Sequence, residues 1–106
     1  MAKKKRKVKR RAAAKRPLEI AFTGDVFTVF FEIDGEEVTL HADPGGGLKK
    51  TFEDFPAGTI EILLHVKGLN TTKWALLMKY DGKTVVDEKD KISGGFSRFI
   101  ESVTLS

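Results

Sequence analysis

The chain has 106 residues, of which 41% are hydrophobic and 32% are charged, so it can form one small packed domain and little more. It has no cysteine, which excludes disulfide frameworks, zinc fingers and thiol nucleophiles. The net charge of +4 averages two unlike parts: residues 1–16 hold ten of the 19 Lys and Arg and none of the 15 acids. Nine cations and all 15 acids remain for the rest, which makes the start +10 and the body −6.

The first seventeen residues are interpreted as a flexible basic arm ahead of a folded body at 18–106. Ten positive charges repel one another and offer almost nothing to bury, so the arm should be disordered when free, and Pro17 then favours an extended backbone. Its cations are the candidate contacts to nucleic acid, because each phosphate they neutralise releases condensed counterions. They are Lys3, Lys4, Lys5, Arg6, Lys7, Lys9, Arg10, Arg11, Lys15 and Arg16. Since no aromatic residue accompanies them, non-specific binding to DNA or RNA is expected.

Part of the arm resembles a targeting signal. The segment 3–8, KKKRKV, resembles the nuclear localisation signal of polyomavirus large T antigens, with Ala2 where the viral signal has proline. The resemblance covers six of the 106 residues and implies binding to importin-alpha and a nuclear location. By that likeness Lys4, Lys5, Arg6 and Lys7 would fill acidic, tryptophan-lined pockets, because cationic stems pack on indole rings while their charges meet carboxylates.

Beyond Pro17 apolar and polar residues alternate, which is typical of half-buried strands. In chain order the expected strands are 18–22, 26–33, 38–42, 48–52, 60–66, 74–80, one that begins at Val85, and 96–105. Asp34-Gly35 and Asp81-Gly82 predict two-residue hairpins. The Gly45-Gly46-Gly47 stretch is expected to carry the chain from one sheet to the other, and the neighbours Phe99 and Ile100 suggest a bulge in the last strand.

These strands predict an all-β domain, an antiparallel β-sandwich of about eight strands that is immunoglobulin-like or jelly-roll-like. In the second strand Phe27, Val29, Phe31 and Ile33 are expected to share the buried face. On the opposite faces of three strands lie Phe30, Leu63 and Leu77. If those three strands were neighbours, the side chains would form an apolar patch suited to self-association or a protein partner.

Catalytic and metal-binding patterns are weak, so neither an enzyme activity nor a cofactor is expected. His41 and His65 both face outward at no ligand spacing, and Asp87-Glu88-Asp90 lacks the spacing of a calcium loop. The sequence has no nucleophile elbow, P-loop or dinucleotide fingerprint. No apolar run approaches the roughly 20 residues that cross a bilayer, and no hydrophobic region follows the basic start. An intracellular location, or the inside of a particle assembled in a cell, is therefore expected, without a membrane partner.

Three interpretations of function stay open at this point. The first is a non-enzymatic binding or assembly protein, whose arm contacts nucleic acid or importin-alpha while the sandwich contacts protein partners or a second copy. The second is a small viral coat protein, because a genome-neutralising arm ahead of a sandwich is similar in layout. The third is an engineered sandwich that carries an import signal, which the two ideal Asp-Gly turns and the absence of cysteine favour.

Overall fold

The structure, a computed structural model, describes residues 14–106. The expected disorder of the arm and the segment that resembles an import signal therefore lie outside the described residues. These described residues form nine strands: β2 (Lys15–Gly24), β3 (Thr28–Ile33), β4 (Glu36–Glu37), β5 (His41–Ala42), β6 (Leu48–Pro56), β7 (Gly58–Lys67), β8 (Lys73–Tyr80), β9 (Lys83–Lys91) and β10 (Phe96–Leu105). Residues 14–106 contain no helix, and so none with the length and hydropathy of a membrane span.

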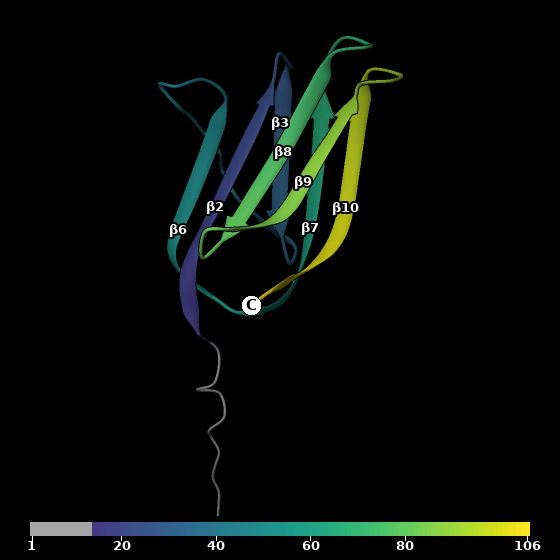
Figure 1. The fold of residues 1–106 in the computed structure, drawn as a ribbon. Helices are drawn as coiled ribbons and strands as arrows, with labels where there is room; N and C mark the ends of the chain where they lie inside the picture. Colours follow the sequence, from purple (N-terminus) through teal and green to yellow (C-terminus); the bar gives the residue numbers. More distant parts are fainter. Residues whose placement is uncertain (1–13) are drawn as a thin grey trace, which may run out of the picture.

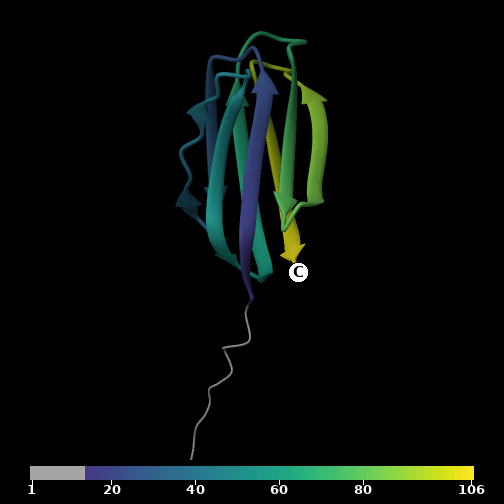
Figure 2. The ribbon, with the colours of Figure 1, turned by 60° about the vertical axis from the view of Figure 1, so that its left-hand side comes forward.

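The strands form two antiparallel sheets that pack face to face. One sheet has the order β10-β7-β3-β4 and the other the order β5-β6-β2-β8-β9. Figures 1 and 2 show β2, β6, β8 and β9 in one layer, with β3, β7 and β10 in the layer behind. The antiparallel β-sandwich expected from the sequence is thereby confirmed.

The core lies between the sheets and follows the alternation of the strands. Successive side chains of a strand point to opposite faces, so every second residue is buried. In β8, for example, Trp74, Leu76, Met78 and Tyr80 are buried while the residues between them face outward. The Trp74 ring stacks on Phe22 of β2, with 6.1 Å between ring centroids. The two sheets are therefore held together by one continuous apolar layer.

Both expected hairpins are present. Asp34 and Gly35 have φ of 51° and 81°, and Asp81 and Gly82 have φ of 53° and 78°. Positive φ at both central residues is what a two-residue turn needs to match the twist of its strands, and Asp-Gly supplies it at low cost. These local signals were sufficient to predict both turns.

The crossing between the sheets occurs elsewhere than expected. Of the predicted strand 38–42 only His41–Ala42, which is β5, forms a strand, and it belongs to the five-stranded sheet. The preceding β4 belongs to the four-stranded sheet, so the chain crosses between the sheets at 38–40, where Val38 and Leu40 pack against the core. The glycine stretch instead closes the turn between β5 and β6 in a single sheet, where the Asp43 N–H donates to the Gly47 carbonyl at 3.0 Å.

Two further expectations about the strands are wrong. Strand β10 pairs with β7 residue by residue from Phe96 to Leu105, so it has no bulge: Phe99 packs against the core and Ile100 faces outward. Phe27 precedes β3 and is 71% exposed instead of buried, because the ladder begins only at Thr28. A register shift does occur in β2 at Pro17, which has no N–H to give to the ladder.

Candidate nucleic-acid interface

The first strand of the sandwich begins at Lys15, three residues before the expected start of the body at residue 18. Strand β2 begins at Lys15, which pairs with Pro56, and Arg16 pairs with Phe55. Two of the ten candidate cations thus belong to the sandwich, because the end of β6 offers them a backbone partner. The other eight, which precede β2, lie outside the described residues: Lys3, Lys4, Lys5, Arg6, Lys7, Lys9, Arg10 and Arg11. Residues 1–13 are called the basic segment below.

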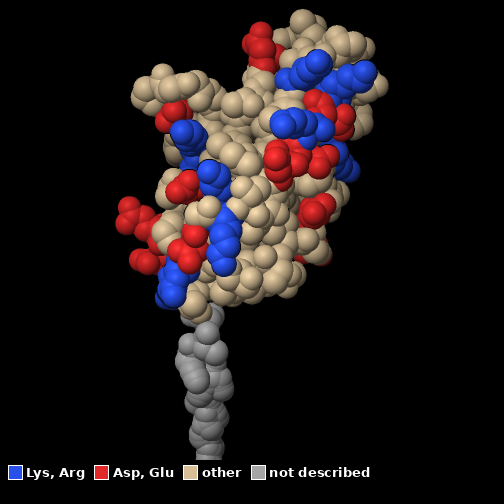
Figure 3. Space-filling model, in the orientation of Figure 1, with Lys and Arg blue, Asp and Glu red and all other residues tan. Residues whose placement is uncertain are grey.

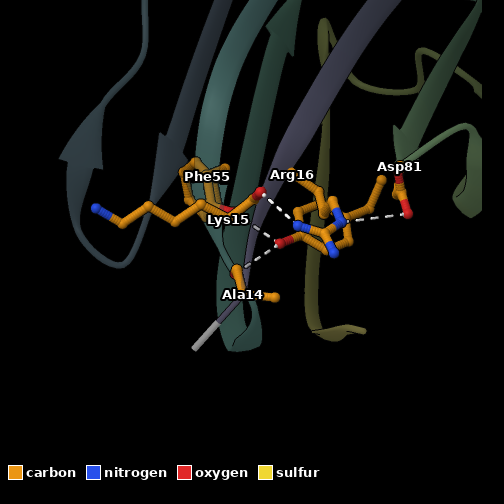
Figure 4. A network of polar contacts seen from close by, with 6 residues as sticks. Ala14, Lys15, Arg16, Phe55 and Asp81 are labelled. Carbon is orange, nitrogen blue, oxygen red and sulfur yellow. Dashed lines mark hydrogen bonds and ion pairs between the residues drawn. The ribbon is translucent and has the colours of Figure 1, made fainter. Parts of the chain in front are cut away.

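The point where the basic segment joins the sandwich is tied to three other parts of the chain. The Ala14 carbonyl accepts from the Ala57 N–H at 2.8 Å. The Tyr80 hydroxyl donates to the Phe55 carbonyl at 2.7 Å and lies 3.3 Å from the Ala14 carbonyl, a network drawn in Figure 4. The Asp81 N–H donates to the Pro17 carbonyl at 2.9 Å. The basic segment is therefore attached at a fixed place, the end of the sandwich where β2 begins.

Lys15 and Arg16 point to opposite sides of β2 (Figure 4). The Arg16 Nε lies 3.7 Å from the Asp81 Oδ2, and its Nη1 donates to the Lys15 carbonyl at 3.1 Å. About half of each side chain in the Arg16–Asp81 pair is exposed, so the pair stabilises the fold by no more than about 1 kcal/mol. Such a weak pair leaves Arg16 available to a phosphate at modest cost.

The apolar patch expected from Phe30, Leu63 and Leu77 does not form. Phe30 in β3 and Leu63 in β7 lie on neighbouring strands of the four-stranded sheet. Leu77 lies in β8 of the five-stranded sheet and faces outward on the opposite side of the molecule. The division arises because the chain changes sheets again between β7 and β8, so that β8 pairs with β2 and β9.

Three aromatic side chains lie close together on the outer face of the four-stranded sheet. Their proximity follows from the strand order and not from any local sequence pattern. Phe30 is the cross-strand partner of His65, and the His65 ring stacks on Phe96 of β10 with 5.4 Å between centroids and 9° between planes. Phe30 and Phe96 are 37% and 48% exposed. These three residues are called the ring cluster. The alternation of Phe96 with the buried Ser97 could have indicated that Phe96 faces outward. It could not have indicated which side chains of other strands lie beside Phe96.

Two cations accompany the ring cluster. Arg98 is the β10 partner of His65, and Lys67 pairs with Phe96. Neither takes part in the three ion pairs found within residues 14–106. A groove of about 400 Å³ runs beside the rings and is lined by Thr28, Val29, Phe30, His65 and Lys67. This part of the face therefore combines exposed rings with unneutralised positive charge.

The acids of the same face lie towards its other end. Glu32 of β3 pairs with Glu37 of β4, and Glu61 of β7 accepts a hydrogen bond from the Ser102 hydroxyl at 3.1 Å. Strand β7 runs from Gly58 to Lys67, so Glu61 lies near its start, whereas His65 and Lys67 lie near its end. Charge thus divides the face into a basic end with rings and an acidic end without them.

The outer face of the five-stranded sheet differs. Figure 3 views it from the front and shows Lys and Arg interspersed with Asp and Glu. Its β2 and β8 strands present Ala21, Ala75 and Leu77, all half-buried. His41 lies in β5 of this sheet and His65 in β7 of the other, so strand pairing does not bring the two histidines together. Among residues 14–106 no group of three or more acidic or histidine side chains could hold a metal ion.

Comparison with known proteins identifies no relative. No protein-family model matches the chain, and neither a curated protein nor a solved structure matches it.

Proposed function

We propose that the chain is a non-enzymatic nucleic-acid-binding protein, in which the basic segment binds the phosphate backbone and the sandwich holds that segment at one end. The observation that supports this most is the division of charge. The basic segment carries eight Lys and Arg with no acid, whereas residues 14–106 carry eleven cations against fifteen acids. Phosphate binding is therefore assigned to the segment, because the sandwich as a whole repels a polyanion.

The positive charge of the basic segment supports binding that is strong at low salt and independent of the nucleotide sequence. Each phosphate neutralised on duplex DNA adds about 0.9 to the slope of log affinity against log salt. A protein with six to ten such contacts loses on the order of 10³ to 10⁵ in affinity between 50 and 200 mM salt. Lys15 and Arg16 adjoin the segment at the start of β2, which extends the cationic run onto the sandwich.

Nuclear import is a second proposed role of the basic segment, supported by the resemblance of residues 3–8 to a nuclear localisation signal. Importin-alpha and nucleic acid would both bind the same lysines and arginines, so each excludes the other. Import would then precede nucleic-acid binding, with release from importin freeing the cations. A viral coat protein would share the basic segment but would also form a shell, which light scattering of the purified protein detects.

The test compares the full chain with a variant that lacks residues 2–13 and retains Ala14 and its backbone contacts. Anisotropy of a labelled 15-base-pair duplex is measured between 50 and 200 mM salt. The deletion should lower affinity at 50 mM salt more than about 100-fold and flatten the salt dependence, since most phosphate contacts are removed.

The matched control removes charge from the sandwich instead. Lys73, Lys89 and Lys91 lie close together on β8 and β9, and replacing all three by Gln should change duplex affinity by less than about threefold. If the truncated chain binds as tightly as the full chain, or the triple variant loses as much as the deletion, the assignment to the basic segment is wrong.

A further inference from the structure

We propose that the outer face of the four-stranded sheet binds the bases of single-stranded nucleic acid on the ring cluster. The inference rests on the proposed function, which brings nucleic acid to this chain. It adds a preference for single strands over duplexes. The basic segment does not provide this preference, because its cations, without rings beside them, contact phosphates in duplexes and single strands alike. The site is formed by Phe30, His65 and Phe96, with Lys67 and Arg98 beside them.

The rings supply a surface on which bases can stack. His65 lies between the two phenylalanines, stacked on Phe96 and paired across the ladder with Phe30. Phe30 and Phe96 are on strands separated by β7 and are staggered by two residues along it, which places their backbones roughly 12 Å apart. Exposed aromatic rings on a sheet face bind unpaired bases of any sequence, because every base has a π-face. The bases of a duplex are stacked on one another and cannot reach such rings.

The cations fit the phosphates that connect those bases. Lys67 lies in the same cross-strand row as Phe96, and Arg98 lies in the same row as His65, so the two cations adjoin the His65–Phe96 stack. The first acid of this face, Glu32, lies in the next row, beyond Phe30 and His65. A single strand crossing the ring cluster would thus find positive charge beside Phe96 and His65. Arg98 also offers a planar guanidinium, which stacks on bases as well as binding phosphate.

The positive charge beside the ring cluster also favours nucleic acid over a second copy of the chain as the partner that binds there. Two copies packed face to face through the ring cluster would bring Lys67 and Arg98 of each into the same interface. Desolvating like charges together costs affinity, whereas a phosphate backbone neutralises them. We therefore take the single strand as the occupant and treat self-association as an outcome of the test.

The position of the ring cluster determines how long a nucleic-acid strand must be to contact both the ring cluster and the end of the sandwich where the basic segment joins it. The basic segment joins the sandwich where β2 begins, at the end where β7 also begins (Figure 1). His65 and Lys67 lie near the far end of β7, whose ten residues span roughly 30 Å. A strand that contacts the sandwich end and the rings together must therefore cover most of the length of the four-stranded sheet.

The experiment compares a labelled 15-nucleotide oligothymidine with a 15-base-pair duplex, both bound to the full chain at 100 mM salt. Replacing both phenylalanines, Phe30→Ala with Phe96→Ala, should weaken binding of the single strand about tenfold or more and change duplex binding by less than about twofold. Leu77→Ala removes an outward apolar side chain from the other sheet and should change neither affinity. Replacing Lys67 and Arg98 by Gln should reduce the salt slope for the single strand by about 1.4.

A second measurement uses the wild-type chain and so does not depend on whether the double variant folds. A 5-iodouridine-containing strand is photo-crosslinked to the wild-type full chain, and the crosslinked peptides are identified by mass spectrometry. Crosslinks at Phe30, His65 or Phe96 support the site, and crosslinks confined to the basic segment overturn it.

The outcomes separate the two proposals. If wild-type protein binds duplex and the double variant keeps its full affinity for the single strand, the ring cluster is not a base-binding site while the proposed function stands. If wild-type protein binds neither probe, both proposals are wrong. If the double substitution converts a dimer to a monomer in light scattering and leaves single-strand affinity unchanged, the rings form an interface between copies, which also overturns the inference.

Discussion

The two outer faces of the sandwich cover the same core yet carry different side chains. The four-stranded sheet exposes Phe30, Phe96 and Ile100 to solvent. The five-stranded sheet presents small or half-buried residues such as Ala21 and Ala75 among its charged side chains. Exposed aromatic side chains gain little stability from burial, so the fold does not require them where they are. The two faces therefore differ in how much apolar surface they leave exposed, and the exposed rings of the four-stranded sheet lie where packing of the core does not require them.

The largest expected effect is on the free energy of unfolding, and it compares an inward ring with an outward ring of β3. Phe31 is 1% exposed in the core, whereas its neighbour Phe30 is 37% exposed on the outer face. Phe31→Ala should lower the free energy of unfolding by about 3–5 kcal/mol, because it leaves a cavity between the sheets. Phe30→Ala should lower it by less than about 1 kcal/mol. Urea denaturation of the two variants measures both values, and equal losses would show that the outer ring is structural.

An intermediate effect is expected at the edge of the five-stranded sheet, in the turn between β5 and β6. Gly47 has a φ of 76°, and a Cβ added there would lie 2.5 Å from the Phe22 carbonyl oxygen in β2. Gly47→Ala should therefore cost about 2 kcal/mol of stability through backbone strain and the forced displacement of the turn.

The matched control for this variant lies two residues earlier. Gly45 has no positive φ, and its added Cβ would meet only the Asp43 carboxylate, at 3.0 Å. Gly45→Ala should change the melting temperature much less than Gly47→Ala. Similar shifts for both variants would mean that the turn adjusts freely and that the close approach to β2 carries no cost.

The smallest effect compares one hydrogen bond in each sheet. Tyr80→Phe removes the part-buried hydroxyl bond to the Phe55 carbonyl and should cost about 1 kcal/mol. Thr59→Val removes an exposed hydroxyl contact to Thr104, 3.1 Å long, on the four-stranded sheet, and should cost less than about 0.5 kcal/mol because water replaces it. Thermal unfolding of both variants measures the difference. A larger loss for Thr59→Val would reverse the ranking.

The sequence predicted the features that depend on short stretches of chain. Alternation placed Leu76 and Met78 in the core, and both Asp-Gly turns follow from the φ values that those residues adopt readily. Pairings between distant strands could not be predicted in the same way. No local pattern indicates that β8 joins β2 in the other sheet, so the expected patch with Leu77 was wrong and the ring cluster with Phe96 was missed. The eight cations of the basic segment were found by composition alone.

The unequal lengths of the edge strands have a consequence for behaviour at high concentration. On one side the sheets end in β4 and β5, which are two residues long and pair with only two residues each of β3 and β6. Most of the edge of β3 and of β6 therefore has no strand partner on that side. On the other side they end in β9 and β10. Strand β9 runs through Asp87, Glu88, Lys89, Asp90 and Lys91. The charges of β9 discourage the strand addition by which fibrils grow. The ten residues of β10 and the uncovered parts of β3 and β6 lack this protection, so self-association on concentration would begin at those edges.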